Sequence, residues 1–206
     1  MLLSKRLLFV TKFVDSQMII ADIGSDHGFL PYYLLQENII QKAFASDNKM
    51  GPYNNLKKTF SSFDQARIEL SLSNGIEKIP EYVNTIIITG MGGELIVKIL
   101  LEGKDKLKNI DNIILSPHSH IEKVREFMMN EGYSLVDEGI VFDEKFYFVL
   151  KYQHGQQVLT KKELLFGPLL IRRKTEEYLN YLKELQKENE NILANSLLTK
   201  EKRIHL

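Results

Sequence analysis

The sequence predicts an α/β protein: a doubly wound, mainly parallel sheet with helices on both faces, followed by a C-terminal helical region. Short apolar runs alternate with amphipathic stretches from residue 18 to residue 153, which is the rhythm of consecutive β-α-β units. The early runs are rich in Ile and Ala and almost uncharged, as strands buried on both faces are. A length of 206 residues suits one full domain with a modest appendage.

The expected strands span residues 18–23, 42–46, 67–72, 85–89, 112–116, 134–142 and 146–152. The N-terminal segment, with charges among its apolar residues, is typical of a helix start rather than of a secretory signal. Gly51-Pro52 opens one helix, residues 93–101 form another, and residues 119–122 have the Ser-x-x-Glu pattern of a capping box that starts a third. The short turn 143–145 predicts that the last two strands form an antiparallel hairpin.

After residue 152 the pattern becomes helical. A polar break at 154–157 precedes a second capping box at 160–163, and Gly167-Pro168 should interrupt the helix that follows. Residues 175–198 predict a long helix with a coiled-coil-like stripe, made of Tyr178, Leu182, Leu185 and Ile192. We therefore expect a first domain over 1–153 and a coiled-coil helical hairpin over 154–206. The hairpin either packs only on itself or also docks a large partner.

Composition narrows the function classes. The net charge is zero, but residues 1–150 hold 16 Lys+Arg against 20 Asp+Glu, whereas residues 151–206 hold 11 against 7. A near-neutral protein is not an obvious nucleic-acid binder, but a basic tail on an acidic body leaves that function open. The chain has no cysteine, which excludes disulfides and thiolate metal sites, and no apolar run reaches the roughly 18 residues of a membrane span. We expect a cytoplasmic protein.

The first strand leads into a glycine-containing turn and then a helix. The order Asp22-x-Gly24-x-x-x-Gly28 resembles the first motif of the class I S-adenosylmethionine (SAM) methyltransferases. The resemblance implies a Rossmann-like fold and SAM as the cofactor, with Asp22 interacting with its ammonium group through water. The glycine turn would pack on the amino-acid part, although Asp26 stands where the usual motif has glycine. The candidate cofactor residues of this turn are Asp22, Gly24, Ser25, Asp26 and His27.

Three later turns strengthen the prediction because the carboxyl ends of parallel strands share one sheet edge. Asp47 follows the second strand, about 20 residues after Asp26, where an acidic group takes the ribose hydroxyls of a nucleoside. The turn after the third strand, residues 72–75, is by itself equally well explained as a simple turn. The further candidate cofactor residues are Asp47, Asn48, Ser73, Asn74, Gly75, Gly90, Met91 and Gly92.

Longer blocks resemble the bacterial tRNA (adenine(22)-N(1))-methyltransferases over nearly the whole chain. These blocks are Ser4-Lys5-Arg6-Leu7, residues 21–27, Gly51-Pro52-Tyr53, residues 90–93 and residues 164–168. The resemblance implies methyl transfer from SAM to N1 of an adenine in the D-loop region of tRNA. The missing Asn/Asp-Pro-Pro-aromatic motif after the fourth strand favours a ring nitrogen over an exocyclic amine. Two residues depart from the family: Phe29, where relatives often have Tyr, and His118, where they commonly have Asn.

Candidate catalytic residues lie in the first turn. The N1 lone pair can attack the methyl directly, so positioning should dominate. Asp26 is the candidate carboxylate for the charge that develops on the adenine, with His27 beside it, and Phe29 is the candidate for stacking on the extruded base. The alternatives are that Asp26 only caps the next helix, that His27 only bonds its loop, and that Phe29 packs in the core.

Candidate RNA contacts are mostly basic. A solvated surface is the alternative for each of Lys5, Arg6, Lys12, Arg172, Arg173 and Lys174, and His118 joins them by its position after the fifth strand. No metal is expected, because His118 and His120 have no obvious third ligand. We expect a monomer. Two other functions stay open: a methyltransferase of a small molecule or protein, and a SAM-binding or interaction module without catalysis.

Overall fold

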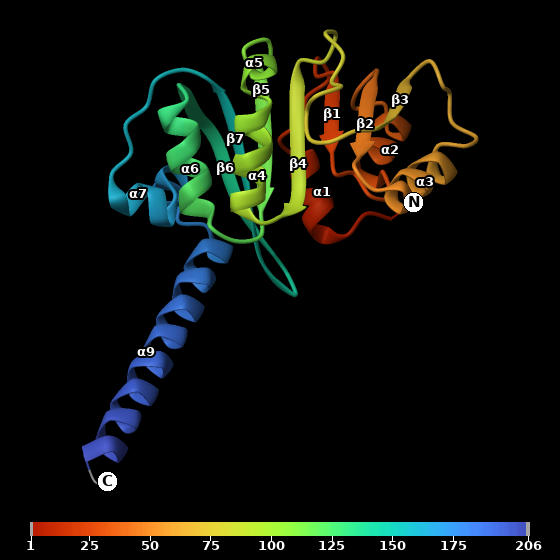
Figure 1. Cartoon of the computed structure of the whole chain (residues 1–206). Coiled ribbons are helices and arrows are strands. Elements are labelled where there is room, and N and C mark those ends of the chain that lie inside the picture. Colours follow the sequence, from red (N-terminus) through yellow and green to blue (C-terminus); the bar gives the residue numbers. More distant parts are fainter. Residues whose placement is uncertain (1, 205–206) are drawn as a thin grey trace.

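The computed structural model describes the backbone of residues 2–204 and the side chains of residues 2–194. It contains one seven-stranded sheet in the order β3-β2-β1-β4-β5-β7-β6 (Figure 1). The strands are β1 (Ile20–Ile23), β2 (Ala43–Asp47), β3 (Ile68–Leu72), β4 (Thr85–Met91), β5 (Asn112–Pro117), β6 (Tyr133–Asp143) and β7 (Lys145–His154). All seven predicted strands are confirmed.

Strand directions follow the predicted doubly wound pattern. β1 pairs in parallel with β2 on one side and with β4 on the other, so that Ile20 lies opposite both Ala43 and Thr85. β7 runs antiparallel to both β5 and β6, which confirms the hairpin. Because β6 runs in the same direction as β1–β5, the β6–β7 turn lies at the carboxyl edge of the sheet. The chain winds outward from β1 to β3 and then returns to β4, so the two halves meet at a switch point between β1 and β4.

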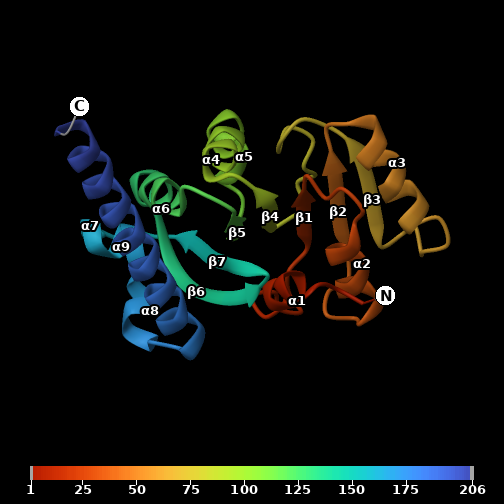
Figure 2. The ribbon, with the colours of Figure 1, turned by 90° about the horizontal axis from the view of Figure 1, so that it is seen from below.

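Helices cover both faces of the sheet (Figure 2). The helices α1 (Lys5–Thr11), α2 (Phe29–Gln36) and α3 (Met50–Thr59) pack on one face through buried residues such as Val10, Leu34 and Leu56. The helices α4 (Gly93–Glu102), α5 (Lys104–Leu107) and α6 (Ile121–Asn130) pack on the other through Ile96, Leu107 and Val124. Burial of these two apolar layers against the nearly uncharged strands is the main driving force for the fold.

Of the two predicted capping boxes, the one at 160–163 is confirmed and the one at 119–122 is wrong. Ser4 Oγ accepts a hydrogen bond from Leu7 N, and Thr160 with Glu163 forms a complete capping box. The capping box expected at 119–122 does not form. His120, with φ of 52°, is the N-cap of α6, and Ser119 Oγ bonds its Nδ1 at 3.2 Å. Ser119 is committed instead to α4, since its carbonyl accepts from Gly93 N at 2.9 Å.

The C-terminal segment begins with two six-residue helices, α7 (Lys161–Phe166) and α8 (Pro168–Arg173), which the predicted break at Gly167 separates. A fully buried ion pair holds them to the body: Arg125 Nη2 lies 3.0 Å from Glu138 Oε2. Arg125 also donates to the carbonyl of Leu164, while Glu138 Oε1 accepts from the N–H groups of Leu169 and Leu170. Because both side chains are fully buried, removing one partner would leave the charge of the other buried and unpaired.

The last helix, α9 (Glu176–Ile204), leaves the body at the carboxyl edge of the sheet and extends away from it (Figure 1). Tyr178 is buried at its base against Phe148 and Ile140. Farther along, Ile192 is 65% exposed, and between residues 2 and 204 no second long helix runs beside α9. The expected two-helix coiled coil is therefore not seen in the described chain. Gly167 breaks the preceding segment into helices too short to form its second arm.

Candidate functional site

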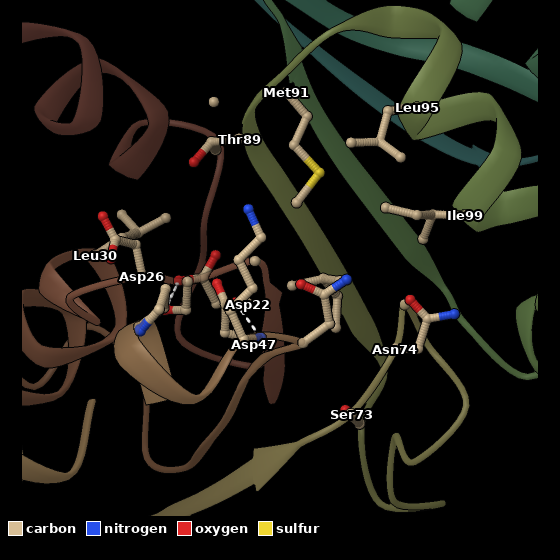
Figure 3. Close-up of a pocket in the computed structure, with 18 of the residues that line it drawn as sticks. Asp22, Asp26, Leu30, Asp47, Ser73, Asn74, Thr89, Met91, Leu95 and Ile99 are labelled. Atoms are coloured by element: carbon tan, nitrogen blue, oxygen red, sulfur yellow. Dashed lines mark hydrogen bonds between the residues drawn. The ribbon is translucent and has the colours of Figure 1, made fainter. Parts of the chain in front are cut away.

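A cavity of about 700 Å³ opens at the carboxyl edge of the sheet, where β1, β2, β3 and β4 end. It lies at the switch point between the two halves, the usual ligand site of open α/β sheets. Asp22 and Asp47 stand on one side, and Leu95 and Ile99 of α4 stand on the other (Figure 3). The cavity therefore has one acidic wall and one apolar wall.

The turn after β1 is shaped by its backbone. The N–H groups of Gly24 and Ser25 both donate to the carbonyl of Ser46, at 2.9 and 3.0 Å, which ties this turn to β2. Gly24 has φ of 70°, which favours glycine, and a Cβ there would stand 2.0 Å from the methyl of Met91. The Met91 side chain, which Figure 3 shows at the cavity, therefore lies against Gly24.

Asp22 is the most perturbed acid of the site. Its side chain is only 3% exposed, and burial raises its pKa to about 6, a rise that the negative charge of Asp47 adds to. The hydrogen bond that Ser25 Oγ donates to Asp22 Oδ2 acts in the opposite direction. A buried carboxylate with one hydroxyl donor has room for a further positive or donating partner.

Asp47 ends β2 and is nearly buried. Its Oδ1 accepts from the backbone N–H of Lys49 at 2.9 Å, which fixes the orientation of the carboxylate. The other oxygen has no bond of this kind among the described residues. A carboxylate held in this way can accept two hydrogen bonds from a vicinal diol.

The ends of β3 and β4 supply small and polar groups. Ser73 is buried, and its Oγ has no hydrogen-bond partner among the described side chains and backbone groups. Gly75, with φ of 52°, lets the turn approach Ile99 of α4. An unsatisfied buried hydroxyl beside an apolar wall fits a heterocyclic ligand that brings its own polar atoms.

Asp26, His27 and Phe29 lie at the mouth of the cavity and are partly exposed. The Asp26 carboxylate is 3.6 Å from His27 Nε2, and the His27 ring stacks on Phe29 with 5.0 Å between centroids. Two of the alternatives are excluded: α2 is capped by Gly28 without any side-chain bond, and the Phe29 ring is not part of the core. Asp26 itself has φ of 50°, in the left-handed region that Asp enters more readily than most other non-glycine residues.

The predicted cofactor residues come together, apart from Gly92, which does not line the cavity and instead forms the N-cap of α4. The residues that line it are Asp22, Gly24, Ser25, Asp26, His27, Asp47, Asn48, Ser73, Asn74, Gly75, Gly90 and Met91. Sequence reasoning missed the face of α4, with Leu95, Lys98, Ile99 and Glu102. The helical spacing of these four residues was the available signal.

The predicted RNA contacts separate into groups. Arg6 and Phe29 line the cavity. Lys5, Lys12 and Arg173 line a second hollow, between α1, β6 and the C-terminal segment, but Arg173 is paired with Asp137 at 2.6 Å. Arg172 and Lys174 are exposed on α8 and just after it, and His118 lies beyond β5 with its ring against Tyr147. The RNA candidates therefore do not form one continuous patch.

Neither a membrane span nor a metal cluster is found in the part of the chain that the structure describes. The donor set of the cavity suits SAM. An acidic wall matches an ammonium group and a ribose diol, and an apolar wall with a nearby unpaired hydroxyl matches a purine.

Comparison with known proteins gives the same family by sequence and by fold. Residues 3–150 match the methyltransferase domain family. The tRNA (adenine(22)-N(1))-methyltransferase of Bacillus subtilis is 34% identical over 194 residues, covering 89% of this chain and 82% of that protein.

Solved structures agree. Streptococcus pneumoniae Sp1610 in complex with S-adenosyl-L-methionine is 33% identical with a TM-score of 0.86, covering 94% of this chain and 95% of that one. TrmK of M. capricolum in complex with S-adenosyl-homocysteine is 29% identical with a TM-score of 0.83, covering 94% and 88%. The chain belongs to the tRNA (adenine(22)-N(1))-methyltransferase family.

Proposed function

We propose that this protein transfers a methyl group from SAM to N1 of adenine 22 of tRNA. The observation that carries the proposal is the cavity in which Asp22 and Asp47 form an acidic wall opposite α4, in a chain of this family. The B. subtilis relative bears the name of this activity, and the M. capricolum relative binds the demethylated cofactor.

The cavity residues bind and orient the cofactor. Asp47 would accept hydrogen bonds from the ribose hydroxyls of SAM, and Asp22 would pair with its ammonium group, which would offset the free-energy cost of a buried, unpaired carboxylate. Ser73 and Asn74 would offer polar groups to the edge of the adenine of SAM, and Ile99 would pack on the ring of that adenine. When bound, SAM supplies an electrophilic methyl on a sulfonium centre.

At the mouth of the cavity the protein has only to place the target base. The adenine N1 lone pair forms the new N–C bond as the S–C bond breaks, so the positive charge moves from sulfur to the base and no protein nucleophile is needed. Phe29 and His27 provide a stacked aromatic surface for the extruded base. Asp26, exposed beside them, stabilises the charge that appears on the adenine.

The C-terminal segment is the natural second contact for a large RNA. α9 leaves the body from the edge that carries the cavity, so a tRNA whose adenine enters the mouth can also lie along this helix. The protein acts as a monomer in the cytoplasm, where its tRNA substrate is found.

The test is transfer of labelled methyl from SAM to unmodified tRNA carrying adenine or guanine at position 22. We expect incorporation only into the adenine form. Transfer to a small molecule or protein alone would support another acceptor, and tight SAM binding without transfer would support a binding module.

The role of Asp26 is tested separately. Asp26→Asn should lower kcat at least tenfold and keep SAM affinity, because its carboxylate is exposed at the mouth of the cavity, whereas Asp22 and Asp47 are buried in it. Asp111→Asn is the matched control, since Asp111 is exposed at the opposite edge of the sheet. Equal kcat for the Asp26 variant and the control would remove Asp26 from catalysis.

A further inference from the structure

Four side chains from three separate elements meet just outside the cavity. The guanidinium of Arg6 (α1) lies 5.5 Å from the centroid of the Tyr147 ring (β7), and Lys145 Nζ lies 5.2 Å from it. His118, after β5, contacts the same ring at 5.3 Å between centroids. We call Arg6, His118, Lys145 and Tyr147 the Tyr147 cluster.

The cluster is tied to the rim of the cavity by backbone bonds. Arg6 N donates to Asp143 Oδ2 at 2.9 Å, which fastens the β6–β7 turn to the start of α1. His118 N donates to the carbonyl of Met91 at 2.8 Å. Arg6 itself lines the cavity, and a Cβ on Gly90 would stand 3.9 Å from its Nη1. The Tyr147 cluster is therefore a fixed extension of the cavity mouth.

Neither cation of the cluster is paired with a carboxylate in the described part of the chain. Among the described residues neither Arg6 nor Lys145 forms a salt bridge, although Asp143 and Glu144 lie in the same turn. Asp143 is engaged by a backbone N–H group. By contrast, Arg173 is paired with Asp137, Lys123 with Glu94 and Lys151 with Asp15.

The positive charges of Arg6 and Lys145 affect the pKa of His118. Burial lowers the pKa of His118, and Lys145 and then Arg6 lower it further. His118 therefore stays neutral near pH 7 and adds no charge of its own, while the ring of Tyr147 fixes both cations by cation–π contact.

We propose that Tyr147 positions Arg6 and Lys145 as a clamp for a phosphate of the RNA strand that carries the target adenine. The proposal rests on the proposed function and deepens it. A base that enters the cavity from a folded RNA brings its own backbone across the rim, where fixed, uncompensated cations would meet it. Arg offers a forked donor set for phosphate and Lys a point charge. Phosphate contacts of this kind set register without reading sequence.

The test compares Lys145→Ala, Tyr147→Leu and Tyr147→Phe with the wild type. Lys42→Ala is the matched control, because Lys42 lies over the Tyr82 ring at 3.8 Å, just before β2 at the opposite edge of the sheet. The measured quantities are the KM for tRNA, kcat, the affinity for S-adenosyl-homocysteine, and the slope of log K for tRNA against log salt.

Lys145→Ala and Tyr147→Leu should raise the KM for tRNA about tenfold, the size of one charge-assisted contact. Lys145→Ala should also reduce the salt slope by about one. Tyr147→Phe, which keeps the ring, and Lys42→Ala should match the wild type, and S-adenosyl-homocysteine should bind all variants equally.

Some outcomes separate the clamp from the proposed function. A wild type that methylates adenine 22, with unchanged KM and salt slope in Lys145→Ala and Tyr147→Leu, would overturn the clamp alone. A wild type that binds tRNA without methylating it would overturn the proposed function, and the salt slopes would still decide the clamp. If Tyr147→Leu weakened S-adenosyl-homocysteine binding as much as it raised the KM for tRNA, the role of Tyr147 would be merely structural. That result would also overturn the clamp.

Discussion

Asp22→Asn should stabilise the free protein and weaken cofactor binding. The wild-type carboxyl is buried, and its pKa of about 6 lies well above the ordinary 3.8 because burial penalises the charged form. Asn has nearly the same shape and cannot ionise. Its amide also presents a donor and an acceptor to the Ser25 hydroxyl, so the variant keeps the local packing while removing the buried charge.

The direction in which Asp22 changes the free energy of unfolding with pH follows from proton binding. The folded state holds the Asp22 proton up to about pH 6, whereas the unfolded chain releases it near 3.8, so this residue lowers the free energy of unfolding as the pH rises between these values. A difference of about two pKa units between the folded and unfolded states lowers the free energy of unfolding by about 3 kcal/mol above pH 7. Between pH 4.5 and 7.5 the stability advantage of Asp22→Asn should grow by about 2 kcal/mol.

The assay is urea unfolding of the wild type and Asp22→Asn at matched pH values, without ligand. Subtracting the two curves cancels groups such as Glu94 and Glu163, whose pKa values are lowered and whose effect on stability has the opposite sign. Calorimetry with S-adenosyl-homocysteine should show wild-type affinity rising as Asp22 ionises, and no such rise in the variant. A stability difference that is constant from pH 4.5 to 7.5 would refute the account of Asp22.

Three further predictions follow from other features. Asp47→Asn should weaken S-adenosyl-homocysteine binding by about 10–100-fold in calorimetry, because the charge on the bonds to the diol is lost. Gly167→Ala should lower the free energy of unfolding in urea by about 2–4 kcal/mol, because its Cβ would stand 2.7 Å from the buried Glu138 carboxylate and φ is 84°. Ending the chain after Leu182 should keep the Tyr178 packing and S-adenosyl-homocysteine affinity, but raise the KM for tRNA at least tenfold in the methylation assay.

Each of the three has an internal check. Gly132→Ala is the control for Gly167, since φ is 82° there but nothing lies within 4 Å of its Cβ, so only the backbone strain remains. Equal destabilisation of the two would exclude the collision with the ion pair. Unchanged cofactor binding in Asp47→Asn would remove Asp47 from the ribose site, and an unchanged KM after truncation would exclude α9 from tRNA binding.

The sheet and most of its site were predictable because the information is local. The run Ile86–Ile88 has no charge and is fully buried, and each strand ends in a turn of small or polar residues such as Ser73-Asn74-Gly75. Parallel pairing then brings these turns to one edge without further assumptions. The apolar wall from α4 was missed because Leu95 and Ile99 have the spacing of an ordinary core-facing helix.

What failed depends on contacts between distant residues. Ser119 begins a plausible capping box, yet its carbonyl accepts a bond from Gly93 of α4, and His120, in a left-handed conformation, becomes the N-cap of α6. The predicted C-terminal helical hairpin is not seen, because Arg125 and Glu138 hold both helices that flank Gly167 to the body. Nothing near Gly167 in the sequence reveals these contacts. The Tyr147 cluster likewise joins residues more than a hundred positions apart.

The length of α9 gives the protein a reach that its globular part lacks. With 29 residues at about 1.5 Å each, this helix measures roughly 43 Å, more than the width of many small domains. Tyr178 anchors the base of this helix to the body, so the far end of α9 is held at a fixed distance from the methyl-transfer site. A folded RNA of the right dimensions could touch both at once, and a short oligonucleotide with the same bases could not.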